Sequence, residues 1–113
     1  MHALIIEDEP LIAMAIEDVL RDSGYSSFDF AVSVQEALKA FAKTCPDLIT
    51  SDVMLKPGNG IDAIEAISKE SPIRVIFITS SPEQVRDRLP AYHIVRKPFS
   101  DSDVTAAVRA ING

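Results

Sequence analysis

Residues that could carry chemistry stand at four separate places in the 113-residue chain. Glu7 and Asp8 follow one apolar run, Asp52 follows another, and Thr79 and Lys97 each end a further one. Three carboxylates brought together would repel one another and raise each other's pKa unless a cation neutralised them. Oxygen ligands supplied by few side chains suit Mg²⁺, which keeps several waters and shares phosphate oxygens. These residue types therefore predict a magnesium site.

Lys97 and Thr79 point beyond a simple metal site, because such a site requires neither an ammonium nor a hydroxyl donor. Both groups suit a phosphoryl group, whose oxygens need pairing on the side away from the metal. The combination predicts phosphoryl transfer onto a carboxylate, with Asp52 as the nucleophile. Mg²⁺ and Lys97 would stabilise the charge, and positioning would supply most of the catalysis. An ionised aspartate attacks without a general base.

Hydrophobic patterning predicts the elements that position these residues. Unbroken apolar or β-branched runs are typical of strands buried on both faces of a parallel sheet. Strands are expected at residues 3–6, 27–32, 47–51, 74–78 and 94–96. Helices are expected from Pro10 to Gly24, between Ser33 and Pro46, from Ile61 to about Ser71, from Ser81 to before Pro90, and between Ser100 and Ile111. Pro90 leaves the fourth helix room for only about two turns.

The strand–helix unit thus repeats five times, with connections short enough to force parallel strands and right-handed crossovers. We expect residues 1–113 to form one domain of the α/β class, a doubly wound, flavodoxin-like fold with a five-stranded parallel sheet and a short fourth helix. In such a sheet, ligands bind beyond the carboxyl ends of the strands. The four chemically active places all fall at that edge.

Composition narrows the classes of function. The chain is 47% hydrophobic and 25% charged, as soluble globular domains are, and its net charge of −6 disfavours nucleic acid and anionic membranes as partners. No stretch approaches the roughly 18 apolar residues of a membrane span. The single Cys45 cannot form an internal disulfide, which predicts a reducing cytoplasm. We expect this cysteine to be a small, partly buried apolar residue.

In this order and spacing, the chain resembles the receiver domain of bacterial two-component response regulators, the CheY-like superfamily. The resemblance runs from Leu4 to about Ile111, and it rests on Glu7-Asp8, Asp52, Thr79 and Lys97-Pro98-Phe99. The segments Glu-Asp-Glu-Pro-Leu-Ile-Ala-Met and Phe-Ile-Thr-Ser-Ser-Pro-Glu are similar to receivers of alphaproteobacterial general-stress regulators and their stand-alone relatives. The resemblance implies a phospho-accepting regulator rather than an enzyme.

The family also implies partners and ligands. A histidine kinase or a histidine phosphotransfer protein would donate the phosphoryl group to Asp52. Asp8 and Asp52 would ligate Mg²⁺, with Glu7 acting through water and the backbone carbonyl of Met54 completing the protein ligands. A downstream protein would contact the face formed by the fourth helix, fifth strand and last helix. The chain would be a monomer or a weak homodimer.

The resemblance further implies a switch and a cis Lys97–Pro98 bond, which costs little for proline. Phosphorylation would pull Thr79 and Lys97 toward the phosphate and shift the loops that follow them. One position departs from the family pattern, because Ile94 stands where an aromatic switch residue is usual. Tyr92 lies nearby but out of register, which leaves open whether the usual coupling of the threonine to an aromatic ring operates.

Three other functions compete with this one. A degenerate receiver that serves only as a docking surface stays open because of Ile94. An aspartyl-phosphate hydrolase of the haloacid dehalogenase type normally has a second aspartate two residues after the nucleophile, where this chain has Met54. A nucleotide-binding domain would need a glycine-rich loop after the first strand, where this chain has three acidic residues and no glycine. Each acidic or hydroxyl residue alone could be a cap or turn residue, but chance rarely places all of them on four strand ends.

Overall fold

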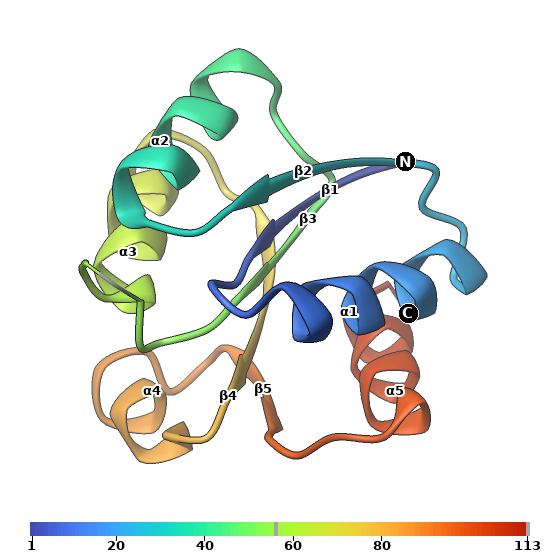
Figure 1. Ribbon diagram of the computed structural model, residues 1–113. Coiled ribbons are helices and arrows are strands. Elements are labelled where there is room, and N and C mark those ends of the chain that lie inside the picture. Colours follow the sequence, from blue (N-terminus) through green and yellow to red (C-terminus); the bar gives the residue numbers. More distant parts are fainter. Residues whose placement is uncertain (56, 113) are drawn as a thin grey trace.

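Strands and helices alternate in the computed structural model, which describes residues 1–55 and 57–112 (Figure 1). The elements are β1 (His2–Ile6), α1 (Pro10–Asp22), β2 (Ser27–Ala31), α2 (Val34–Lys43), β3 (Leu48–Ser51), α3 (Gly60–Glu70), β4 (Arg74–Thr79), α4 (Pro82–Arg88), β5 (His93–Arg96) and α5 (Asp101–Asn112). The predicted five strand–helix repeats are confirmed. The fourth helix has seven residues, as the position of Pro90 led us to expect.

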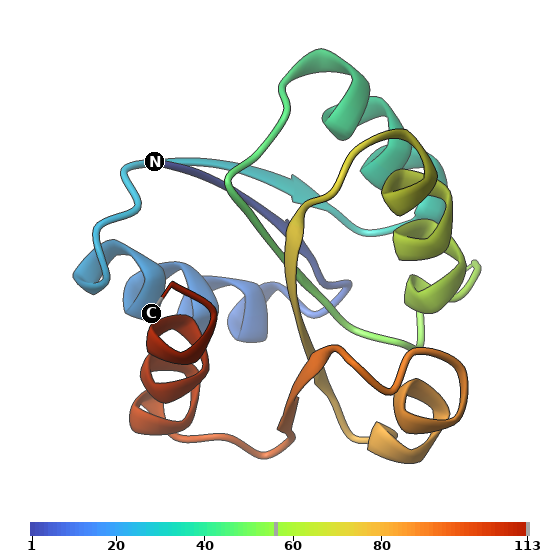
Figure 2. The same cartoon turned by 180° about the vertical axis from the view of Figure 1, so that it is seen from behind.

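The five strands form one parallel sheet in the order β2-β1-β3-β4-β5. The sheet has helices on both faces, with α1 and α5 on one side and α2 and α3 on the other (Figures 1 and 2). This arrangement is the doubly wound, flavodoxin-like fold that the sequence predicted. The change of strand order beside β1 places the carboxyl ends of β1 and β3 next to each other.

The core consists of two apolar layers, one on each face of the sheet. On β1, Leu4 and Ile6 pack into the layer under α2, α3 and α4, whereas Ala3 and Ile5 pack into the layer under α1 and α5. All four side chains are buried. Burial on both faces explains why this strand reads as an unbroken apolar run rather than an alternating one.

Local capping fixes where the helices begin. At α2, the Ser33 hydroxyl accepts a hydrogen bond from the Glu36 N–H (3.2 Å), and the Glu36 carboxylate accepts one from the Val32 N–H (3.0 Å). At α5, the Ser100 hydroxyl accepts a hydrogen bond from the Asp103 N–H, and the Asp103 carboxylate accepts one from the N–H of Ser100 itself. These pairs satisfy backbone donors at and before the helix starts, and the sequence predicted caps at both Ser33 and Ser100.

One expectation about a side chain is wrong. Cys45 is exposed rather than partly buried, because in the turn between α2 and β3 the neighbouring Pro46 is the residue that is buried. Among the described helices, none has both the length and the apolar character that a membrane crossing needs. A cytoplasmic location stays a prediction.

Candidate functional site

Backbone hydrogen bonds carry the sheet pattern one residue past the strand ends and so align the polar residues there. The Asp52 N–H donates to the Ile6 carbonyl, and the Lys97 N–H donates to the Thr79 carbonyl, both at 2.9 Å. The carboxyl ends of β1, β3, β4 and β5 therefore present their following residues at one edge of the sheet. The sequence predicted that the candidate residues would lie at this edge of the sheet, and the structure has them there.

Three carboxylates converge at this edge. Glu7, Asp8 and Asp52 each offer an oxygen, and these oxygens lie within 4.8 Å of one another. Glu7 is only 3% exposed and Asp52 is 7% exposed, while Asp8 is half-buried. Burial raises the pKa of Glu7 and the charge of Asp52 adds to this rise, although the hydrogen bond from Lys97 opposes it. The cluster is thus an electrostatically unfavourable set of acids that calls for cations.

Lys97 supplies one of those cations. Its Nζ donates hydrogen bonds to Glu7 Oε1 and to Asp52 Oδ2, both at 2.8 Å, and lies 3.7 Å from Glu9 Oε2. Burial alone would lower the pKa of Lys97, but its hydrogen bonds to Asp52 and Glu7 outweigh that effect and hold the pKa above its usual value. The ammonium therefore stays charged between the two buried carboxylates.

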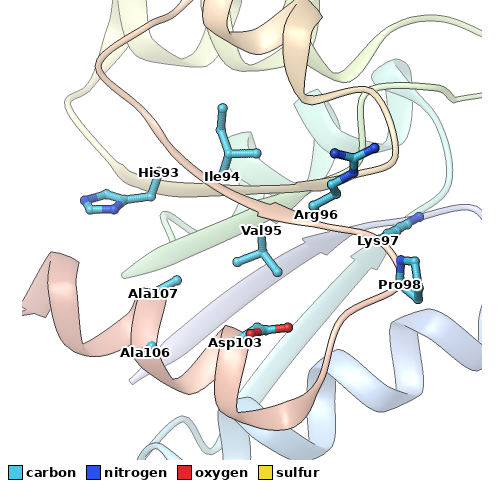
Figure 3. A pocket seen from close by; sticks show the side chains of 9 residues that line it. All are labelled: His93, Ile94, Val95, Arg96, Lys97, Pro98, Asp103, Ala106 and Ala107. Carbon is cyan, nitrogen blue, oxygen red and sulfur yellow. The ribbon is translucent and has the colours of Figure 1, made fainter.

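The Lys97–Pro98 peptide bond is cis, as the resemblance implied. Both residues directly follow β5, and Figure 3 shows them where the chain leaves that strand for the loop leading to α5. Pro98 itself is exposed.

Thr79 ends β4 with its side chain fully buried. Its Oγ1 accepts a hydrogen bond from the Ser81 N–H at 2.9 Å, so the hydroxyl is engaged with the start of the next segment. The structure thus brings Glu7, Asp8, Asp52 and Lys97 into one cluster. Thr79 stands at the neighbouring strand end, with its hydroxyl paired to backbone instead.

The two remaining predicted residues occupy different surroundings. Met54 lies two residues beyond Asp52, and its side chain is 58% exposed. Its expected role concerns the backbone carbonyl and stays a prediction. Ile94 is half-buried, stands opposite Phe77 in the register of β4 and β5, and packs against the core layer under α2, α3 and α4.

Sequence reasoning missed two residues that hold the acceptor loop. The Ser51 hydroxyl donates to the Asp52 carbonyl oxygen at 2.8 Å. Gly60, the first residue of α3, packs so closely on that loop that an added Cβ would lie 1.7 Å from the same carbonyl oxygen. Residues 57–60 are proline, glycine, asparagine and glycine, which are typical of a turn. The close approach of α3 to Asp52 is instead a tertiary contact that the local sequence does not encode.

Comparison with known families agrees with this fold. The chain belongs to the response regulator receiver domain family, whose model matches residues 3–109. Members of this family are regulators rather than classical enzymes. The predicted family is thereby confirmed.

Particular relatives place the chain within the family. It is 37% identical over 109 residues to the phyllosphere-induced regulator PhyR of Methylorubrum extorquens, covering 93% of this chain and 41% of that protein. It is 29% identical over 116 residues to the chemotaxis protein CheY of Thermotoga maritima, covering 98% and 97%. Among solved structures, the receiver domain of Erythrobacter litoralis PhyR matches with a TM-score of 0.88 at 40% identity, covering 96% and 87%.

The similarity to alphaproteobacterial stress regulators is thus also confirmed. The chain spans less than half the length of the PhyR protein from Methylorubrum extorquens that it matches.

Proposed function

We propose that residues 1–113 form one receiver domain that accepts a phosphoryl group on Asp52. The donor is a phosphohistidine on a histidine kinase or a histidine phosphotransfer protein. The observation that carries this proposal is the position of Lys97 Nζ, 2.8 Å from the carboxylates of both Asp52 and Glu7. A charged ammonium beside a buried aspartate is where a phosphoryl group on that aspartate needs a counter-charge.

The donor set fits Mg²⁺. Glu7, Asp8 and Asp52 offer carboxylate oxygens, the ligands that this hard cation prefers, and their oxygens are already within 4.8 Å of one another. Three carboxylates outnumber the single ammonium of Lys97, so the cluster accommodates a further divalent charge. Asp8 and Asp52 would hold the ion directly, with Glu7 through water and the Met54 carbonyl completing the set. The bound ion would supply charge neutralisation for the phosphoryl oxygens.

The chain's own residues orient the acceptor. Asp52 Oδ1 accepts a hydrogen bond from the Val53 N–H at 2.7 Å, and Oδ2 accepts one from Lys97. In the transfer, an oxygen of the ionised Asp52 forms a bond to phosphorus while the phosphorus–nitrogen bond of the donor breaks. Lys97 then pairs the phosphoryl oxygens, and the Thr79 hydroxyl turns from the Ser81 N–H toward them.

This movement reaches the surface formed by α4, β5 and α5, which we propose contacts a downstream protein. A groove of about 590 Å³ lies along β5 and α5, and Lys97 and Pro98 form part of its lining (Figure 3). A shift of Lys97 would therefore change the shape of this groove directly. The related PhyR of Bartonella quintana is described as an anti-anti-sigma factor, so a protein acting on another regulator is the kind of partner we propose.

Beryllofluoride, which mimics a phosphoryl group on aspartate, tests the proposal. With saturating Mg²⁺, beryllofluoride or acetyl phosphate should shift the amide signals of the residues around Asp52, Thr79 and Lys97 in a two-dimensional NMR spectrum. Asp52→Asn should abolish these shifts, because it removes the attacking oxygen. The control is Asp22→Asn, which changes an exposed aspartate at the far end of α1. An unchanged wild-type spectrum would support a receiver that serves only as a docking surface.

A further inference from the structure

Two side chains at and just beyond the end of α4 hold α3. The Arg88 guanidinium pairs with Asp62 at 2.9 Å and also with Glu65. One turn further along α3, the Ser68 hydroxyl lies 2.9 Å from the Tyr92 hydroxyl. We name these five residues, Asp62, Glu65, Ser68, Arg88 and Tyr92, the α3–α4 clasp. The three members on α3, Asp62, Glu65 and Ser68, are three residues apart in sequence and therefore share one face of that helix.

Tyr92 is packed as well as hydrogen-bonded. Its ring centroid lies 5.8 Å from that of Phe77 on β4, at an interplanar angle of 31°. Tyr92 and Ile94 both pack against the core layer under α2, α3 and α4. The ring of Tyr92 is therefore fixed against β4 and α3. It lies two residues before Ile94, the position at which the family usually has an aromatic residue.

The rest of α4 is weakly held. The helix has seven residues, of which only Pro82 and Val85 are buried, and its N-cap residue Ser81 makes no side-chain capping bond. A helix this short is not stable by itself and takes its position from tertiary contacts. Just beyond α4, Leu89 and Tyr92 pack against the core layer under α2, α3 and α4. The α3–α4 clasp adds polar contacts that fix this end of the helix to α3.

Both helices joined by the clasp begin next to residues of the acceptor site. α3 begins at Gly60, against the backbone of Asp52. α4 begins three residues after Thr79, whose hydroxyl accepts a hydrogen bond from the Ser81 N–H. If Thr79 turns toward a phosphoryl group, the start of α4 loses this bond, and the contacts of Arg88 and Tyr92 at its other end are then what opposes a shift of the helix.

We infer that the α3–α4 clasp is a latch that holds α4 in the position it has when Asp52 is unmodified. This inference rests on the proposed function. The latch is closed when Asp52 is free and opens when Asp52 carries a phosphoryl group, so the two positions of α4 are two states in equilibrium. By linkage, contacts that stabilise the closed state must weaken the binding of any ligand that favours the open state.

Tyr92→Phe tests the latch, because it removes only the hydroxyl and keeps the ring against Phe77. Beryllofluoride titrations at saturating Mg²⁺, followed by amide NMR signals, should show about two- to fivefold tighter binding than wild type, the effect of one lost hydrogen bond. Ser68→Ala should give the same gain, and the double variant should gain no more than either single variant. The control is Tyr25→Phe, which removes the hydroxyl of the other tyrosine and should leave the affinity unchanged.

Arg88→Gln provides a second route if Tyr92→Phe folds poorly. It should also tighten beryllofluoride binding, whereas Arg86→Gln on the same helix should not. Without beryllofluoride, the Tyr92→Phe and Arg88→Gln variants should move the α4 amide signals toward their positions in the beryllofluoride-bound wild type. Looser packing alone would speed hydrogen exchange in α4 without improving affinity.

The outcomes separate the two claims. If the wild type binds beryllofluoride but neither Tyr92→Phe nor Arg88→Gln binds it more tightly, the latch is wrong and the proposed function stands. If the wild type does not respond to beryllofluoride, the proposed function fails and the latch fails with it.

Discussion

Lys97 balances the charge of the acceptor site. Its ammonium lies 2.8 Å from the buried carboxylates of Glu7 and Asp52. Lys97→Met would leave both without a counter-charge, and we expect the free energy of unfolding to fall by about 2–4 kcal/mol at neutral pH in the absence of divalent ions. Chemical denaturation in a chelating buffer measures this, with Lys69→Met on the exposed end of α3 as the control.

The same variant tests the metal site without any phosphoryl chemistry. Because Mg²⁺ and the ammonium neutralise the same carboxylates, Mg²⁺ should raise the melting temperature of Lys97→Met by more than that of the wild type. Equal Mg²⁺ effects on the two proteins would show that the ion does not bind among Glu7, Asp8 and Asp52.

A substitution at Ile94 tests whether acceptance of the phosphoryl group and binding of a downstream protein depend on different residues. The residue is half-buried against the core beside Phe77 and lies outside the cluster of acids around Lys97. We expect Ile94→Tyr to leave beryllofluoride affinity within about twofold of wild type, since no contact with the acceptor changes. Binding of a downstream protein should change. A large loss of acceptance would mean that Ile94 belongs to the reaction.

At the scale of the elements, the start of α3 sets the geometry of the acceptor loop. A Cβ on Gly60 would lie 1.7 Å from the Asp52 carbonyl oxygen and 2.6 Å from Ser51 Oγ, so Gly60→Ala must push α3 away from the loop. We expect a loss of about 1–3 kcal/mol or more in the free energy of unfolding, together with weaker beryllofluoride binding.

Gly24→Ala is the matched control for this prediction. Its φ of +103° makes alanine strained there, but the added Cβ has ordinary space and the residue follows α1 far from Asp52. It should lower stability and leave beryllofluoride binding unchanged, as denaturation and titration of the same sample can show. Equal binding by both alanine variants would contradict a role for α3 in positioning Asp52.

The elements that the sequence predicted correctly are those with local signals. Strands buried on both faces read as apolar runs, and the capping pairs at Ser33 and Ser100 mark helix starts from residues three apart. The acidic residues and Lys97 could be placed together because parallel strands end at one edge. The contacts of Gly60 with Asp52 and of Tyr92 with Ser68 could not be predicted from the sequence. Each joins two elements, and no short segment specifies how those elements pack.

At the scale of the whole molecule, the two edges of the sheet have different roles. The carboxyl ends of the strands carry the acids and Lys97, whereas the opposite edge is held by structural contacts. There the His2 ring nitrogens contact Ser27 and Asp29 at 2.8 and 2.9 Å, and the His2 backbone N–H donates to Asp47 at 2.7 Å. These contacts join the first residue of β1 to β2 and to the turn before β3. Changes at this edge should therefore affect stability without affecting acceptance.

Tyr25 gives this separation a pH-dependent test. Its hydroxyl is buried, and burial raises the pKa of the phenol above its usual value of 10.0. Above that pH the unfolded chain releases the phenolic proton before the folded protein does, so the wild type loses stability as pH rises. The Tyr25→Phe variant has no phenol at this position and cannot lose stability in this way. The free energy of unfolding should therefore fall less steeply between about pH 9 and about pH 11 in the variant, while beryllofluoride affinity at neutral pH stays that of the wild type. Parallel slopes would mean that the phenol titrates alike in both states, and altered affinity would mean that the two edges are coupled.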